Sequence, residues 1–148
     1  MESMKPRQRL SALLVSTVCG LLTGCGSEVE LAPVEGRVLY NSEPLSFGSV
    51  MFQPPRGQPA SGVIQSDGTF VLDTVGAGDG AAVGRNKVRV TCFEAQDPNA
   101  KPDQFGEGLG RSLIPKKYNQ YDTSGIEVEV SPDQNDRMTI ELAGSSEE

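Results

Sequence analysis

The chain contains no histidine and no tryptophan, and only five phenylalanines and three tyrosines among its 148 residues. Without histidine, the Ser-His-Asp and Cys-His catalytic arrangements, the usual zinc ligand sets and the commonest general base at neutral pH are excluded. Basic residues are also scarce, with 13 against 20 acidic ones and a net charge of −7. Because a nucleic-acid binder needs a positive surface that displaces counterions, this balance argues against nucleic acid as a partner.

Glycine and proline, by contrast, are frequent, with 17 and 10 residues. Both residue types favour turns, so the composition is typical of short strands joined by many turns. A chain of this length leaves room for one modest domain.

An apolar run, Leu10–Leu22, follows three basic residues near the N-terminus, Lys5, Arg7 and Arg9. As a helix this run would reach only about 20 Å, short of the roughly 30 Å hydrocarbon core of a bilayer. The pattern therefore indicates an export signal rather than a membrane-spanning helix.

The run ends in Leu22-Thr23-Gly24-Cys25, which resembles the bacterial lipobox. This resemblance implies cleavage between Gly24 and Cys25 and attachment of a diacylglycerol to the Cys25 thiol. The alternative is an ordinary cysteine behind an ordinary signal peptide. We expect a lipoprotein signal peptide over 1–24 and a lipidated tether over 25–32.

The three cysteines are consistent with this processing. Cys19 leaves with the signal peptide and Cys25 carries lipid, so Cys92 has no partner for an internal disulfide. Cys92 lies within an alternating apolar pattern, which predicts a buried, inert thiol rather than a reactive one.

Apolar and polar residues alternate in short segments along the rest of the chain. Between two of these segments, Asp67-Gly68 is a strong hairpin-turn signal. Period-2 alternation without a helical period predicts a seven-stranded antiparallel β-sandwich over 33–143, followed by a disordered tail over 144–148. The expected strands are 34–40, 49–53, 61–65, 69–73, 87–94, 126–130 and 138–142.

Four groups of residues resemble carboxypeptidase regulatory-like (transthyretin-like) domains, and the last is similar to a segment of small lipoproteins from planctomycete-type bacteria. They are Val34–Val38 with Glu43–Leu45, Ser66–Phe70, Gly84–Val90, and Ile114–Tyr118 with Thr123–Ile126. The resemblance implies a prealbumin-like or Ig-like sandwich that is accessory or adhesive rather than catalytic. Asn86 departs from it, because the family often carries an aromatic residue there.

Two stretches lack periodicity. Residues 76–84 are rich in glycine but lack the Lys-Ser/Thr ending of a phosphate-binding loop, so we expect a flexible loop. Residues 95–125 form a long irregular stretch, which usually packs over a core or carries function. Within it, Leu113 and Ile114 are expected to plug the open edge of the sandwich.

The same stretch carries Lys116, Lys117, Tyr118 and Tyr121. Two positive charges beside two amphipathic rings could contact an acidic or sugar-bearing partner. The alternative is a solvated loop.

Carboxylates suggest two further chemistries. Asp67, Asp73 and Asp79 could offer oxygens to Ca²⁺, but turns use aspartate for local hydrogen bonds as well, and we expect the turn role and no metal. Glu127 and Glu129 could serve glycoside hydrolysis, but an exposed strand face explains them better.

These observations predict an exported, lipid-anchored protein of the cell envelope, facing the periplasm or exterior, that acts as a non-catalytic structural or binding module without a cofactor. Expected partners are the membrane, through the lipid, and an envelope protein or glycan. The alternative is a carbohydrate- or calcium-binding accessory receptor of the envelope, and an envelope hydrolase is third.

Overall fold

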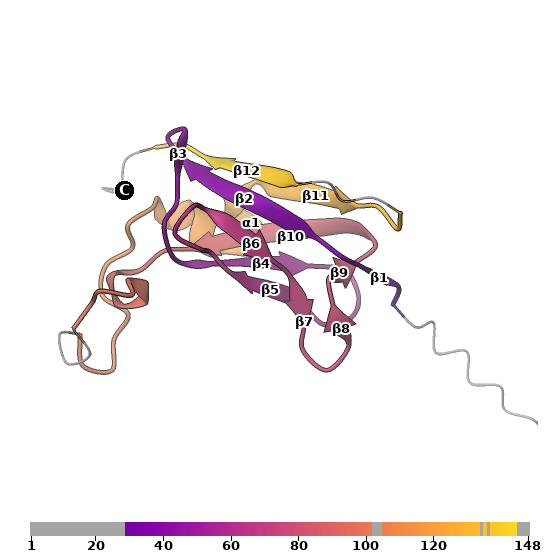
Figure 1. The fold of residues 1–148 in the computed structure, drawn as a ribbon, viewed down its shortest axis with the longest axis horizontal. Coiled ribbons are helices and arrows are strands. Elements are labelled where there is room, and N and C mark those ends of the chain that lie inside the picture. The colour runs from indigo at the N-terminus through magenta and orange to yellow at the C-terminus, as the bar shows by residue number, and fades with distance from the viewer. Residues whose placement is uncertain (1–28, 102–104, 134, 136, 145–148) are drawn as a thin grey trace, which may run out of the picture.

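The computed structural model describes residues 29–101, 105–133, 135 and 137–144. The expected signal peptide, Cys25, most of the tether and residues 145–148 lie outside this range. The described chain folds into two layers of short strands (Figure 1). The expectation of an all-β fold with antiparallel sheets is confirmed for the described residues, with one exception given below.

One layer is a six-stranded sheet in the order β11-β10-β4-β5-β7-β8. The other contains β12, β2 and β3, and β6 pairs with β2. A two-stranded ladder joins β1 to β9. The strands are β1 (Leu31–Ala32), β2 (Glu35–Tyr40), β3 (Glu43–Pro44), β4 (Ser49–Gln53), β5 (Ala60–Val63), β6 (Thr69–Val71), β7 (Asp73–Thr74), β8 (Gly78–Asp79), β9 (Ala81–Ala82), β10 (Gly84–Thr91), β11 (Ile126–Val130) and β12 (Met138–Leu142).

The pairing of β12 with β2 is parallel, which corrects the expectation that every strand pairs antiparallel. β11 and β12 are consecutive in the chain but belong to different sheets. The connection crosses from one layer to the other, so β12 lies along β2 with the same direction instead of forming a hairpin with β11.

The strand expected over 69–73 is also divided between the layers. β6 pairs with β2, whereas β7 pairs with β5 in the other sheet. Leu72 lies at the crossing, where it is buried and its N–H donates to the Val34 carbonyl oxygen at 3.1 Å. The turn at Gly68 has the positive φ expected, +83°. It does not close a hairpin between its flanking strands, because β5 pairs with β4 and β7 whereas β6 pairs with β2.

The apolar core fills the space between the layers. Phe52 of β4 and Phe70 of β6 meet there with ring centroids 6.3 Å apart. Ile114 is buried in this core and Leu113 packs against it, so both residues contribute to the core as the sequence suggested. The largest fully buried side chains are Phe52, Phe70, Leu72, Ile114, Leu142, Val34, Val38, Val50, Val88, Val90, Val130 and Asn86.

Two segments expected to be flexible belong to the fold. Leu31–Ala32, placed in the tether, pairs with Ala81–Ala82, placed in the glycine-rich loop 76–84. Ala32, Ala81 and Ala82 are buried. Small side chains let these segments pack closely, and periodicity cannot reveal strands of two residues.

The chain from 95 to 125 has little regular structure, as expected. Its described part, together with Glu94, contains two 3₁₀ helices and one short α-helix, which are η1 (Glu94–Gln96), η2 (Lys116–Asn119) and α1 (Tyr121–Ser124). No helix among the described residues is long and apolar enough to cross a membrane.

Candidate functional site

The expected Lys/Tyr cluster divides into exposed lysines and a buried tyrosine. Lys116 and Lys117 of η2 are exposed, but Tyr118 is only 6% exposed. The Tyr118 hydroxyl donates to the Ala143 carbonyl oxygen and accepts from the Ala143 N–H, both at 3.1 Å. Tyr118 therefore ties η2 to the end of β12. Its buried ring lies beneath the Lys117 ammonium, which is 5.0 Å from the ring centroid.

Tyr121 of α1 lies on the outer face of the six-stranded sheet. The Arg89 guanidinium lies 5.1 Å from the centroid of the Tyr121 ring and donates to the Met51 sulfur at 2.8 Å. Nearby, Lys87 forms an ion pair of 2.7 Å with Asp122, which raises the pKa of Lys87 and lowers that of Asp122. Tyr121 is engaged with Arg89 and separate from the Tyr118 contact.

The three aspartates considered for calcium do not converge. The Asp67 carboxylate accepts the Thr69 N–H at 3.0 Å and the Thr69 hydroxyl at 2.6 Å, bonds that lower the pKa of Asp67. Asp73 and Asp79 lie opposite each other on β7 and β8. No group of three or more acidic or sulfur ligands suited to a metal occurs among the described residues.

Glu127 and Glu129 lie on the exposed face of β11. Their partners across the ladder on β10 are Lys87 and Arg85. Arg85 also approaches Glu127 at 3.9 Å. The two carboxylates lie on one strand beside basic residues, an arrangement that differs from two acids facing each other across a cleft.

Cys92 is buried, as the alternation predicted. Burial raises the pKa of the Cys92 thiol to about 11. The thiol is therefore protonated at neutral pH, which makes it a poor nucleophile.

Asn86, the departure from the family pattern, is a fully buried polar side chain in β10. Its Nδ2 donates to the carbonyl oxygens of Ala82 at 2.8 Å and Gly84 at 2.9 Å. Its Oδ1 has no hydrogen-bond partner in the described structure. Asn86 thus holds the bend between β9 and β10 in place.

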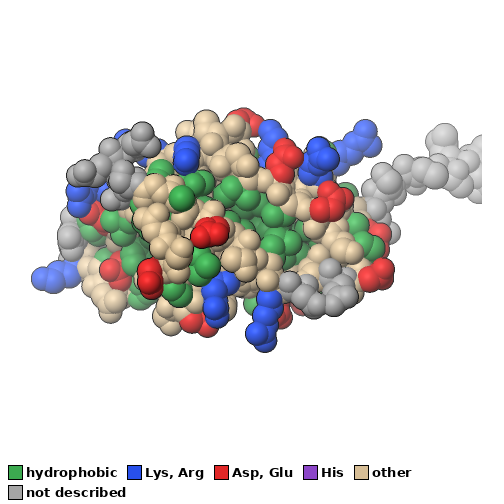
Figure 2. Space-filling model, turned by 90° about the horizontal axis from the view of Figure 1, so that it is seen from above, with side chains coloured by type: hydrophobic (Ala, Val, Ile, Leu, Met, Phe, Trp, Pro, Cys, Tyr) green, Lys and Arg blue, Asp and Glu red, His purple; other side chains and the backbone are tan. Residues whose placement is uncertain are grey.

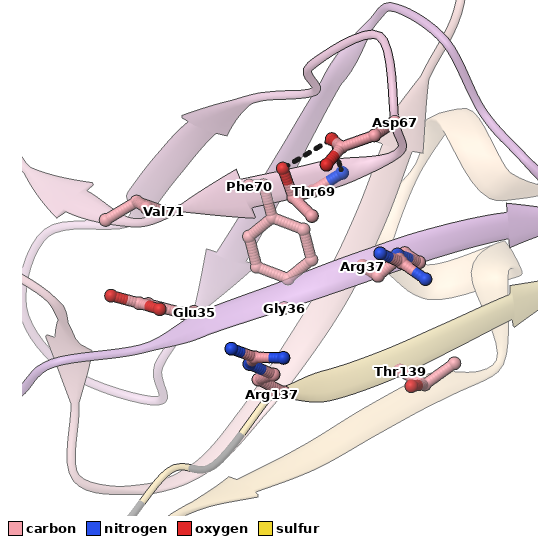
Figure 3. A pocket seen from close by; sticks show the side chains of 9 residues that line it. All are labelled: Glu35, Gly36, Arg37, Asp67, Thr69, Phe70, Val71, Arg137 and Thr139. Carbon is pink, nitrogen blue, oxygen red and sulfur yellow. Dashed lines mark hydrogen bonds between the residues drawn. The ribbon is translucent and has the colours of Figure 1, made fainter.

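A hollow of about 480 Å³ on the outer face of β6, β2 and β12 was not predicted from the sequence (Figure 3). It combines two arginines and two carboxylates with threonine side chains. The lining residues are Glu35, Gly36, Arg37, Asp67, Thr69, Phe70, Val71, Arg137 and Thr139.

The register of the three strands builds this hollow. Arg37 of β2 pairs with Thr69 of β6 on one side and with Thr139 of β12 on the other. Short threonines thus flank a long arginine, and Figure 3 shows Asp67 and Thr69 at one rim and Thr139 at the other. The outward positions of 34–40 were visible in the sequence, but their partners lie up to 102 residues away along the chain.

β11 and β12 are the end strands of the two sheets, and no ladder joins them in the described structure. Figure 2 views the molecule from above β12 and shows apolar side chains gathered in the centre of this face. Ile126, Val128 and Met138 of these strands are partly buried against the core. The layers are not hydrogen-bonded to each other along this edge in the described structure.

Comparison of the chain with protein-family models, curated proteins and solved structures finds no significant match.

Proposed function

We propose that this protein is an exported, lipid-anchored cell-envelope protein that acts as a non-catalytic structural or binding module. The observation that carries the proposal is the run Leu22–Cys25, placed directly behind a basic segment and a short apolar segment. Two or three acyl chains at Cys25 would hold the protein firmly, because each buried methylene contributes about 0.8 kcal/mol.

The arrangement of the fold supports a module displayed from a membrane. β1, which contains the last two residues of the expected tether, lies at one end of the sandwich. The described parts of residues 94–113 extend from the other end (Figure 1). We call residues 94–113 the 94–113 loop. Glu94 holds its base in place, because the Glu94 carboxylate accepts hydrogen bonds from the Arg111 backbone N–H at 2.9 Å and from the Arg111 Nε–H at 3.0 Å. The chain would thus enter the sandwich from its anchor at the end opposite this loop.

We further propose that the domain follows the carboxypeptidase regulatory-like plan, a prealbumin-like sandwich. Its seven strands would correspond to the seven described strands of three or more residues, which are β2, β4, β5, β6, β10, β11 and β12. The order of the motif-like segments and their place on strands β2, β6 and β10 support this. The lack of a histidine and the raised pKa of the buried Cys92 thiol support a role without nucleophilic or His-based catalysis.

Substitution of Cys25 tests whether this residue carries the lipid anchor. In a bacterial host, Cys25→Ser should abolish the added acyl mass and move the protein from the detergent phase to the aqueous phase, in uncleaved or miscleaved form. Cys19→Ser is the matched control, because Cys19 lies within the expected leader, and it should keep both the acyl mass and the detergent partitioning. A wild-type chain without acyl mass, or a Cys25→Ser variant that still partitions into detergent, would contradict the proposal.

A further inference from the structure

We propose that the hollow on the outer face of β6, β2 and β12 binds a small saccharide unit that carries a carboxylate. In this assignment Arg37 and Arg137 hold the carboxylate, and Glu35 and Thr139 bind hydroxyl groups of the same unit. This site lies on a sheet face and does not depend on lipid anchoring.

The main evidence for a carboxylate ligand is the pair of arginines, Arg37 and Arg137. Guanidinium groups bind carboxylates through paired, charge-assisted hydrogen bonds. Arg37 lies on β2 and Arg137 directly precedes the neighbouring strand β12, and both line the same hollow (Figure 3). Neither forms an ion pair within the described part of the chain. Three other described cations, Arg85, Lys87 and Arg111, do form ion pairs.

One of the two acids that line the hollow is already engaged. Asp67 uses one carboxylate oxygen to accept both the N–H and the hydroxyl of Thr69. These bonds hold Asp67 in its turn at the rim. Arg37 stands on a paired strand between two threonines, so its base is fixed by hydrogen bonds on both sides.

Arg137 has an unusual backbone conformation. Its φ is +30°, outside the regions that residues with long side chains normally adopt. Such strain concentrates at binding sites, where a side chain must be aimed in one direction. Arg137 directly precedes β12, so this conformation sets the point from which its side chain leaves the sheet.

The other lining groups select the kind of anion. Glu35 and Asp67 place two negative charges beside the arginines, which disfavours a doubly charged phosphate relative to a singly charged carboxylate. The Glu35 carboxylate accepts hydrogen bonds from hydroxyl groups, and the Thr139 hydroxyl can donate or accept. Val71, which is 62% exposed, offers an apolar contact for the C–H face of a sugar ring.

The size of the hollow agrees with this ligand. Its volume of about 480 Å³ lies within the range of roughly 300–1,000 Å³ that is usual for small-ligand sites.

Titration calorimetry of the full chain in detergent, with galacturonate, galactose and inorganic phosphate as probes, tests the proposal. Galacturonate should bind saturably and at least tenfold more tightly than either other probe. Arg37→Gln and Arg137→Gln should each weaken galacturonate binding at least about tenfold, the loss expected for a charge-assisted contact. Arg56→Gln, an exposed loop change with the same loss of charge, should leave it unchanged.

Each other result overturns the assignment. Absence of saturable galacturonate binding would show that the hollow does not bind this ligand. Equally tight binding of galactose would show that the arginines do not recognise a carboxylate. Binding of phosphate as tight as that of galacturonate removes the selection for a carboxylate. Unchanged galacturonate affinity in both arginine variants, with folding verified by circular dichroism, places the ligand elsewhere.

Discussion

Gly36 of β2 lies directly opposite Phe70 of β6, and the Phe70 ring occupies the space that a side chain at position 36 would fill. A Cβ at Gly36 would lie 2.5 Å from a ring carbon of Phe70 and 2.5 Å from the Met138 carbonyl oxygen. The glycine in the segment Val34–Val38 is therefore required by the packing of three strands. This packing also fixes the backbone beneath the hollow.

Gly36→Ala should lower the free energy of unfolding by at least about 2 kcal/mol, because the Met138 carbonyl belongs to a paired strand and cannot move aside. Chemical denaturation measures the effect. Gly108→Ala is the control, since a Cβ there meets only one atom, at 3.3 Å, in an exposed loop, and a change within about 0.5 kcal/mol is expected. Equal stability of the two variants would contradict the close contact at Gly36.

Tyr118→Phe should lower the free energy of unfolding by about 1–2 kcal/mol, because both hydrogen bonds to Ala143 are lost while the ring remains. Thermal unfolding is the measurement. Tyr121→Phe should have little effect, since no hydrogen bond of the Tyr121 hydroxyl occurs among the described residues. A larger loss of unfolding free energy for Tyr121→Phe than for Tyr118→Phe would contradict the hydrogen bonds of Tyr118 to Ala143. It would favour the exposed Tyr118 that the sequence suggested.

Asn86→Asp should destabilise the fold by about 3 kcal/mol at pH 7, because a buried carboxylate would face the carbonyl oxygens of Ala82 and Gly84. Burial raises the pKa of the introduced acid above its unfolded value, near 3.9. Its folded state then binds more protons than its unfolded state as pH rises above that value, so the loss relative to wild type grows with pH.

Denaturation of wild type and Asn86→Asp at pH 4 and pH 7 measures this growth. Gln58→Glu, which changes an exposed loop amide to a carboxylate, should show no comparable pH dependence. A loss that is the same at both pH values would mean that position 86 is accessible to water.

The hydrogen bonds between Glu94 and Arg111 at the base of the 94–113 loop should weaken in acid. Hydrogen bonds from Arg111, the backbone N–H first, hold the pKa of Glu94 below its ordinary value of 4.5. A depressed folded pKa means that the stabilisation is complete above pH 4.5 and is lost as pH falls through the lower folded value. Hydrogen exchange at the Glu94 and Ala95 amides, which bond across the loop base, should therefore lose protection below pH 4.5.

Glu94→Gln is the matched variant for this measurement, because the amide keeps the size of the side chain but does not titrate. Its amides at 94 and 95 should be less protected at neutral pH and should show no further loss below pH 4.5. A drop in protection of the same size in the variant would assign the acid effect to another group.

Local alternation determined much of this protein from its sequence. Val50 and Phe52, or Val88 and Val90, point to one face because side chains alternate along a strand, and the structure buries all four. Asp67-Gly68 specified its turn through the positive φ that glycine adopts freely. The export signal and the lipidation of Cys25 are also predicted from short local motifs, and they remain predictions because these residues lie outside the described range.

Contacts between distant segments were decided by the tertiary structure alone. Tyr118 carries no local sign that its hydroxyl will meet Ala143, and nothing near Arg37 shows that Thr139 will lie beside it. Leu72 lies where one predicted strand divides between two sheets, because the core requires the chain to cross there. Periodicity reports which face of a strand is buried, whereas the neighbouring strand and its direction depend on how the whole chain packs.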